Sequence, residues 1–381
     1  MDKIKVMTVF GTRPEAIKMA PLVLEMKKYH QDIECIVTVT GQHREMLDQV
    51  LKTFEIIPDH DLNIMQSKQT LMDMTTRSLQ GLDKLISEIK PHIVLVHGDT
   101  TTTFSASLAA FYNQVMVGHV EAGLRTGNKF SPFPEEVNRE LTGVIADLHF
   151  SPTDVAKNNL LHEGKKTEDI YVTGNTAIDA LRTTVQDHYT HPVLEELNGR
   201  EFILLTAHRR ENLGQPMKSM FRAVKRLVDE HKELDVIYPV HLNPVVQGIA
   251  KEVLGHDDRI HLIEPLEVLD FHNFASRARI ILTDSGGVQE EAPSLGIPVL
   301  VLRDTTERPE GIKAGTLKLV GTDENVIFNL ANKLLTDEGM YGEMSKASNP
   351  YGDGNASRRI VEAILQKFDK RAERPDEFKM L

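Results

Sequence analysis

The sequence predicts an α/β fold made of two doubly wound parallel-sheet domains. Short apolar runs rich in Val and Ile recur along the whole chain, and segments with helical periodicity separate them. Strands that alternate with helices form parallel sheets covered by helices on both faces. The length of 381 residues exceeds one ordinary hydrophobic core and suits two such domains.

The candidate strands divide into two sets. In the first half they are 4–10, 34–40, 92–99, 115–122, 148–152 and 170–174; in the second half they are 202–208, 235–241, 260–265, 279–286 and 298–304. The polar stretch 184–200 carries no strand signal, so the domain junction is placed within 174–200. We therefore expect an N-terminal domain over 1–175 and a C-terminal domain over 176–355.

Composition narrows the functional classes. Hydrophobic residues make up 40% and charged residues 26%, as in soluble globular proteins, and no apolar run reaches the roughly 18 residues of a membrane span. The start runs directly into a strand and lacks a signal-peptide pattern. Cys35, the single cysteine, lies in an apolar run, which predicts a buried thiol without a disulfide and a reducing, cytoplasmic location. A net charge of −12 disfavours nucleic acid as a partner.

Polar clusters follow seven of the candidate strands. They are FGTRPEAIK, GQHRE, HGDTTTT, HVEAGLR, TAHRREN, PVHLNP and TDSGGVQEE. Ligands of doubly wound sheets bind outside the carboxyl ends of the strands, and two facing domains would place the ligand in a cleft between them. The sequence therefore predicts a cleft lined with functional groups.

The segment after the tenth candidate strand indicates a diphosphate site. The strand ends at Asp284, Ser285–Gly287 form a turn, and a helix is expected from about 288. Glycines let backbone approach a phosphate closely, and a helix N-terminus favours negative charge. Glu290 and Glu291 would lie in the first turn and accept hydrogen bonds from ribose hydroxyls. Ordinary helix capping is the alternative interpretation.

Three basic residues are candidates for anion contacts. Arg308, beyond the next strand, could clamp a phosphate, although an arginine before a proline is often only a loop residue. Arg13 and Lys18 follow the first strand, where Pro14 suits the first turn of a helix. Lys18 alone is equally compatible with a solvated helix face.

Acidic residues at strand ends are the candidate acid–base groups. Asp99 and Glu121 each end an apolar run, and Glu135 lies in the segment that follows. Carboxylates at buried strand ends are costly unless they are paired or used. Pairing with Arg125 or Arg139 is the structural alternative.

The spacing of the histidines and the lack of two glycine-rich motifs disfavour metal binding, dinucleotide binding and P-loop kinase chemistry. His43, His208 and His241 lie at strand ends but lack the helical spacing and cysteine partners of common zinc sites, so no metal is expected. Neither G-x-G-x-x-G nor G-x-x-x-x-G-K-[ST] occurs, which disfavours a dinucleotide site and a P-loop kinase.

Taken together, these motifs closely resemble the non-hydrolysing UDP-N-acetylglucosamine 2-epimerases. The resemblance spans nearly the whole chain, in order, through GTRPEAIKMAPL, GQHREML, HGDTTTT, HVEAGLRT, PFPEEVNR, TAHRRENLG, PVHLNP, DSGGVQEEAPSLGIPVL and RDTTERPE. It implies two Rossmann-like domains of the glycosyltransferase-B type, with the active site between them. It also implies a C-terminal helix, 356–375, that returns to the first domain.

The resemblance also implies roles for individual residues. Substrate contacts would fall on Arg13, Lys18, Asp99, Glu121, His208, Ser285, Gly286, Gly287, Glu291 and Arg308. Uracil would lie against Leu266 and Phe271, and His208 joins Asp99, Glu121 and Glu135 in the catalytic set. A second UDP-N-acetylglucosamine, bound as an allosteric activator, would contact Gln42, His43, Gln69, Glu135, Arg209 and His241.

The implied reaction inverts C2 of UDP-N-acetylglucosamine without a cofactor, through loss of UDP and a 2-acetamidoglucal intermediate. The resemblance further implies a homodimer that supplies a precursor of a cell-surface polysaccharide. Two enzymatic alternatives remain: a hydrolysing epimerase that releases N-acetylmannosamine and UDP, and a glycosyltransferase of the same fold. A UDP-sugar sensor without activity is the alternative from a different class.

Overall fold

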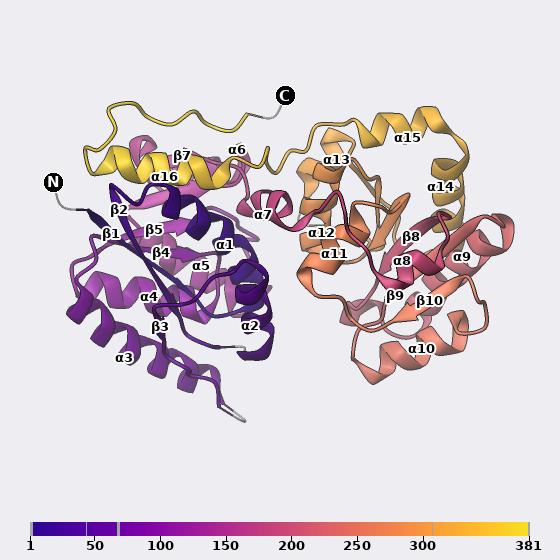
Figure 1. The fold of residues 1–381 in the computed structure, drawn as a ribbon, viewed down its shortest axis with the longest axis horizontal. Helices are drawn as coiled ribbons and strands as arrows, with labels where there is room; N and C mark the ends of the chain where they lie inside the picture. Colours follow the sequence, from indigo (N-terminus) through magenta and orange to yellow (C-terminus); the bar gives the residue numbers. More distant parts are fainter. Residues whose placement is uncertain (1–2, 43, 67–68, 307, 380–381) are drawn as a thin grey trace. The chain divides into compact units, whose positions relative to one another are not determined.

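The computed structural model describes residues 3–42, 44–66, 69–306 and 308–379. The chain forms two compact units. The first runs to Thr183 and takes up the chain again over Tyr351–Lys379; the second is Thr184–Pro350. The division thus falls after Thr183, where the sequence suggested 175. Each unit is described by itself (Figure 1).

The first unit contains a seven-stranded parallel sheet in the order β3-β2-β1-β4-β5-β6-β7. Its strands are β1 (Ile4–Phe10), β2 (Ile33–Val39), β3 (His60–Asp61), β4 (Ile93–His97), β5 (Met116–Val120), β6 (Leu148–Ser151) and β7 (Ile170–Val172). Its helices are α1 (Arg13–Lys28), α2 (Arg44–Thr53), α3 (Leu71–Ile89), α4 (Thr101–Tyr112), α5 (Glu135–Ile145), α6 (Asp154–His162), α7 (Thr176–Thr184) and α16 (Ala356–Lys367), with a short 3-10 turn η1 (Thr167–Asp169).

The second unit contains a six-stranded parallel sheet in the order β10-β9-β8-β11-β12-β13. Its strands are β8 (Glu201–Thr206), β9 (Leu234–Pro239), β10 (Ile260–Ile263), β11 (Ile280–Thr283), β12 (Val299–Val301) and β13 (Leu317–Leu319). Its helices are α8 (Pro192–Glu196), α9 (Gln215–Glu230), α10 (Pro244–Leu254), α11 (Val268–Ala275), α12 (Gly286–Glu291), α13 (Pro309–Ala314), α14 (Glu324–Thr336) and α15 (Glu338–Ser345), with η2 (Arg210–Asn212) and η3 (Ala292–Leu295).

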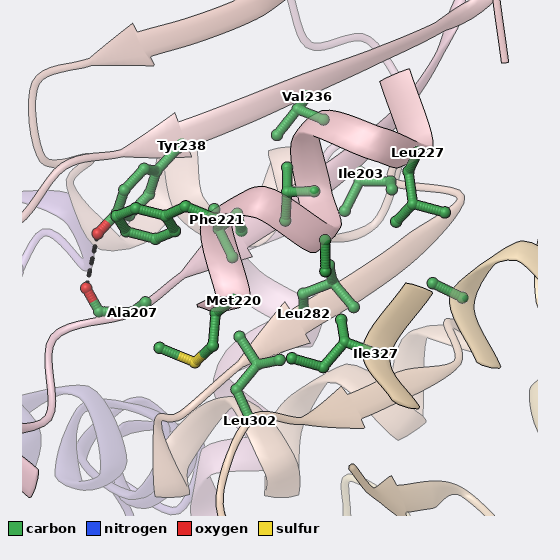
Figure 2. Packing of buried hydrophobic residues seen from close by; sticks show 14 of the residues in the cluster. Ile203, Ala207, Met220, Phe221, Leu227, Val236, Tyr238, Leu282, Leu302 and Ile327 are labelled. Atoms are coloured by element: carbon green, nitrogen blue, oxygen red, sulfur yellow. Dashed lines mark hydrogen bonds between the residues drawn. The ribbon is translucent and has the colours of Figure 1, made fainter. Parts of the chain in front are cut away.

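Both sheets bury apolar side chains on their two faces. In the second unit, Ile203 and Leu205 of β8 point to the face covered by α9, α10 and α14, and Phe202 and Leu204 point to the opposite face. Figure 2 shows the first of these cores, where the Tyr238 hydroxyl donates a 2.7 Å hydrogen bond to the carbonyl oxygen of Ala207. Burial on both faces explains why the strands read as continuous apolar runs.

The N-terminus of helix α1 carries the residues that typically start a helix. Thr12 is its N-cap, Pro14 lies in its first turn, and Glu15 closes a capping box with Thr12. The helix packs against α2 and α16, so the C-terminal helix belongs to the first unit (Figure 1). That helix ends at Lys367 rather than near 375, because the chain turns at Asp369, whose φ is +57°.

The prediction of two doubly wound parallel-sheet domains is confirmed. The sequence missed β3 and β13, which have only two and three residues and lie at sheet edges, so they lack long apolar runs. None of the helices in the described part of the chain has both the length and the hydropathy that a membrane span requires.

Candidate functional site

Both sheets reverse their winding direction at a defined pair of strands. In the first unit β1 and β4 are neighbours, and in the second unit β8 and β11 are neighbours. Segments that leave two such strands move apart to opposite faces of the sheet and leave a crevice at its carboxyl edge. The turns after these four strands carry Arg13, Asp99, His208 and Ser285. The topology therefore places four predicted site residues at the expected positions.

Glu121 lies directly after β5 in a strained backbone conformation. Its φ is +62°, in the left-handed region that costs a non-glycine residue roughly 1–2 kcal/mol. Its Oε2 accepts a hydrogen bond from the Lys18 ammonium and another, of 2.9 Å, from Asn175 Nδ2. His97 Nε2 lies 3.6 Å from the same oxygen. Helix α1 and the ends of β4, β5 and β7 thus converge on one carboxylate.

Asp99 occupies a different environment two residues after β4. Its side chain forms an ion pair with Arg139, and Asn138 Nδ2 donates a 2.9 Å hydrogen bond to its backbone carbonyl. Burial raises the pKa of the Asp99 carboxyl, and the charges of Glu121 and Glu135 add to that effect, while Arg139 opposes it. The pairing with Arg139, considered as a structural alternative, is therefore present and does not remove the perturbation.

Glu135 and Glu136 have separate environments at the start of α5. Glu136 is fully buried and accepts hydrogen bonds from the backbone N–H groups of Thr126 (2.7 Å) and Gly127 (2.8 Å). Glu135 is only half-buried, and its charge acts on Asp99. Glu136 therefore orders the loop before the helix, and Glu135 is the carboxylate available for chemistry.

The turn after β1 is built around the buried carboxylate of Glu15. This group accepts hydrogen bonds from the N–H groups of Gly11 (3.0 Å) and Thr12 (2.8 Å) and from the Thr100 hydroxyl (2.6 Å). Burial raises the pKa of Glu15, and these hydrogen bonds oppose the shift. Glu15 thereby ties the start of α1, which carries Arg13, to the start of α4.

Besides Glu135, three residues of the predicted activator site belong to the first unit, and their outcomes differ. Gln42 Oε1 accepts a 3.1 Å hydrogen bond from Thr102, at the start of α4. Gln69 contacts Gln66 and Arg77, on its own loop and on α3. His43 lies outside the described residues. These hydrogen bonds place Gln42 beside the start of α4, which follows β4, and place Gln69 beside α3.

In the second unit, Asp284 organises the loop after β8. Its fully buried carboxylate accepts hydrogen bonds from the backbone N–H groups of His208 (2.9 Å) and Arg209 (2.9 Å) and from Asn212 Nδ2 (3.2 Å). Arg209 also donates through Nε to the Asp284 carbonyl at 3.2 Å. Asp284 thus fixes the two predicted residues that follow β8.

His208 and His241 stack on each other. Their ring centroids are 5.5 Å apart with an interplanar angle of 11°, and His208 Nδ1 lies 3.4 Å from Asp284 Oδ1. Burial lowers the pKa of His208, Asp284 opposes the shift, and His241 and Arg209 add to it. His208 is therefore predominantly neutral near pH 7.

The turn after β11 differs in one respect from the prediction. Helix α12 starts at Gly286, two residues earlier than expected, so Glu290 and Glu291 are its last residues and not its first turn. Arg308 lies over Gly286, where a Cβ atom would be 3.1 Å from the guanidinium carbon, and pairs with the buried Glu290 at 2.9 Å. Ser285 makes no capping hydrogen bond with its side chain, so the ordinary capping interpretation is wrong for Ser285.

The predicted ribose and uracil contacts lie on neighbouring elements. Glu291 Oε2 is 3.4 Å from Nε2 of the buried His272, whose Nδ1 hydrogen-bonds to the Thr184 hydroxyl at 2.6 Å. Leu266 and Phe271 are partly buried and pack against the core beside α11 and α12. Within the described residues, no cluster of three or more His, Cys, Asp or Glu side chains has the geometry to hold a metal ion.

Comparison with known proteins identifies the family. The family model described as UDP-N-acetylglucosamine 2-epimerase matches residues 25–365. The UDP-N-acetylglucosamine 2-epimerase of Bacillus subtilis (strain 168) is 68% identical over 378 residues, which cover 99% of each chain. The chain belongs to the UDP-N-acetylglucosamine 2-epimerase family.

Solved structures of this epimerase family match at least 95% of the chain. A crystal structure of a UDP-N-acetylglucosamine 2-epimerase matches with a TM-score of 0.94 at 66% identity and covers 100% of both chains. The Neisseria meningitidis UDP-GlcNAc 2-epimerase bound to UDP-GlcNAc matches with a TM-score of 0.86 at 50% identity, covering 95% of this chain and 100% of that one.

Sequence reasoning missed several residues of this epimerase that support the predicted ones. Asn175 follows β7, and Asp284 follows β11, so the strand-end rule could have identified both. His97 is the last residue of β4 and the first residue of the HGDTTTT cluster, from which only Asp99 was named as a candidate. His272 lies within α11, and no local pattern links it to Glu291.

Proposed function

We propose that the protein interconverts UDP-N-acetylglucosamine and UDP-N-acetylmannosamine without hydrolysis and without a redox cofactor. The observation that carries this proposal is the pair of carboxylates after the neighbouring strands β4 and β5. Glu121 is held by an ammonium, and Asp99 has a raised pKa. Two carboxyl groups whose environments differ in this way suit one base and one acid.

The chemistry follows from the weak acidity of the C2 proton, which no adjacent carbonyl group activates. In the forward direction the C1–O bond breaks and its electron pair leaves with UDP. The C2 proton passes to a base, and the electrons of the C2–H bond form the C1=C2 double bond of 2-acetamidoglucal. Return of a proton to the opposite face of C2 and of UDP to C1 completes the inversion, so water and redox equivalents are not consumed.

The acid–base roles are assigned by electrostatics. Glu121, whose negative charge the Lys18 ammonium stabilises, takes the C2 proton. Asp99, whose carboxyl group is partly buried and retains its proton to higher pH, delivers a proton to the opposite face. Glu135 assists through its charge on Asp99.

The leaving diphosphate is assigned to the turn after β11. Gly286 and Gly287 offer backbone N–H groups beside Ser285, whose own N–H donates to Thr283 Oγ1 at 3.0 Å, and Arg308 lies over Gly286. Together with Arg13 they stabilise the charge that develops on UDP. The ribose is assigned to Glu291 and the uracil to Leu266 and Phe271. The predominantly neutral His208 acts as a hydrogen-bonding group of the catalytic set.

Proton NMR of the purified protein with UDP-N-acetylglucosamine in D₂O, without any added cofactor, tests the proposal. UDP-N-acetylmannosamine carrying deuterium at C2 is the expected product. Free N-acetylmannosamine with accumulating UDP would assign the chain to a hydrolysing reaction. Binding without any change in the spectrum would favour a glycosyltransferase or a sensor.

The proposal includes an allosteric site for a second UDP-N-acetylglucosamine. Gln42, His43, Gln69, Glu135, Arg209 and His241 are its proposed contacts, and the stacking of His241 on His208 offers a physical link to the catalytic set. In the reverse direction, UDP-N-acetylmannosamine alone should react slowly, and a trace of UDP-N-acetylglucosamine should accelerate it. Equal initial rates with and without the trace would contradict this site.

We also propose a cytoplasmic homodimer that supplies a cell-surface polysaccharide precursor. Helices α4 and α5 of the first unit pack together and expose Phe111, Tyr112, Leu141 and Val144, and exposed apolar clusters of this kind often mark interfaces. Sedimentation equilibrium should give twice the chain mass, and Val144→Asp should give the monomer. A monomeric wild-type protein would contradict the proposal.

A further inference from the structure

The carboxylate of Glu121 has two kinds of neighbour at the same oxygen. Lys18 and Asn175 donate hydrogen bonds to Oε2, whereas His97 Nε2 lies 3.6 Å away, just beyond hydrogen-bonding distance. His97 is 4% exposed, and Nε2 makes no hydrogen bond in the structure. A buried polar atom without a partner is unfavourable, so a small shift of the Glu121 carboxylate onto this nitrogen would be favoured.

The imidazole of His97 is uncharged near neutral pH. Burial lowers its pKa to about 4; the negative charge of Glu121 opposes the shift and Lys18 adds to it. His119, on the next strand, is also buried, and burial lowers its pKa to about 3. His97 can therefore donate one hydrogen bond through Nε2 without adding positive charge to Glu121.

We infer that His97 is a positioning residue that replaces Lys18 as the partner of Glu121 when substrate binds; this rests on the proposed function. The Lys18 ammonium pairs with Glu121 in the structure, and this positive charge keeps Glu121 a weak base. When the ammonium turns to the bound substrate, Glu121 shifts by less than about 1 Å onto Nε2 of His97 and stays bonded to Asn175. Exchange of a charged donor for a neutral one raises the basicity of Glu121 only in the complex.

Three variants and two readouts test this exchange. His97→Leu removes the donor, His97→Gln restores an N–H donor near Nε2, and His149→Leu is the matched control. His149 is another buried histidine with an unpartnered nitrogen, and it lies on β6, whereas Glu121 follows β5. The rate of C2–H exchange in D₂O and the Kd for UDP, measured by calorimetry, are determined for each variant.

His97→Leu should slow C2–H exchange by about 10- to 100-fold, as expected for loss of a hydrogen bond to a charged group. It should change the Kd for UDP by less than about twofold, and His97→Gln should recover most of the rate. Exchange within about threefold of wild type in His97→Leu overturns the inference. Equal loss in His149→Leu, or no recovery in His97→Gln, also overturns it, because either result indicates a packing role.

A spectroscopic measurement separates this inference from the proposed function. In ¹⁵N-histidine-labelled protein, the nitrogen shifts of His97 should show the neutral tautomer with the proton on Nε2, before and after UDP-N-acetylglucosamine is added. A bare Nε2 overturns the inference even when the protein is an active epimerase. Absence of C2–H exchange in wild type overturns the proposed function, and the inference with it.

Discussion

At the scale of single residues, the two carboxylates of the candidate site differ by the charge beside them. Glu121 has a lysine and an asparagine on one oxygen, and Asp99 has an arginine on one side and two carboxylates within electrostatic range. The fold thus gives two chemically similar carboxyl groups different electrostatic environments. Their amide variants should separate chemistry from binding.

Glu121→Gln and Asp99→Asn should each lower turnover by about 10²- to 10⁴-fold, the usual contribution of a positioned acid or base. The Kd for UDP should remain within about twofold of wild type, because the proposed UDP contacts lie on other residues. Steady-state kinetics and calorimetry measure the two quantities. Glu140→Gln, an exposed residue on α5, is the control with unchanged turnover. Full activity in both amide variants would rule out the assignment.

The buried histidines predict a loss of stability in acid. Burial lowers the pKa of His97 and His149 to about 4, and of His119 to about 3, from 6.5 in the unfolded chain. Because the unfolded state binds protons first as the pH falls below 6.5, stability decreases from there down to the folded pKa. At pH 5 each histidine should cost about 2 kcal/mol relative to pH 7.5.

Urea unfolding followed by far-UV circular dichroism at pH 7.5 and pH 5 checks this expectation. His149→Leu should lose less stability than wild type between the two pH values, whatever its stability at pH 7.5. Glu15, whose pKa is raised by burial, makes stability change with pH in the opposite direction. This contribution is the same in wild type and His149→Leu, so it cancels when the two proteins are compared. An identical pH dependence in both proteins would show that His149 is not held neutral.

At the scale of elements, the first turn of the chain is closely packed. A Cβ atom on Gly11 would lie 2.0 Å from Thr40 Oγ1 and 2.6 Å from Thr102 Oγ1, which are hydrogen-bonded to each other at 2.9 Å. Gly11→Ala must displace both hydroxyls, so it should destabilise the protein by about 1–3 kcal/mol. It should also lower activity, because the same turn carries Arg13.

Thermal and urea unfolding measure the Gly11 effect against a matched glycine. Gly248 lies in the exposed interior of α10, where a Cβ atom would meet nothing within 4 Å. Gly248→Ala should stabilise the protein by up to about 1 kcal/mol through helix propensity. A neutral Gly11→Ala would indicate that the β1–α1 turn can widen without cost.

At the scale of the whole molecule, the two units should respond differently to UDP. Most of the proposed UDP contacts, among them Ser285, Gly286, Glu291 and Arg308, belong to the second unit, whereas Arg13 belongs to the first. Bound at 100 times its Kd, UDP should stabilise this unit by about 2.7 kcal/mol. Hydrogen exchange read by mass spectrometry should show the protection mainly within Thr184–Pro350. Stronger protection around Asp99 and Glu121 would indicate that UDP binds to the first unit instead.

The sequence predicted the fold class and most strand positions because parallel strands buried on both faces leave long apolar runs. It also marked Asp99, Glu121, His208 and Ser285, since the carboxyl ends of such strands carry the functional groups. It misplaced the start of α12 by two residues, because a turn of consecutive glycines gives no local signal for the first helical residue. It missed β3 and β13 because short edge strands lack a continuous apolar run.

The sequence by itself thus determined the alternation of strands and helices, the chemical groups at the strand ends and, through its motifs, the family. The tertiary structure alone decided which groups touch: Lys18 and Asn175 on Glu121, Arg139 on Asp99, and His272 on Glu291. These contacts join residues from 40 to more than 100 positions apart, except for the closer pair His272 and Glu291. Side-chain contacts across strand ends depend on sheet order and register, which no local pattern encodes.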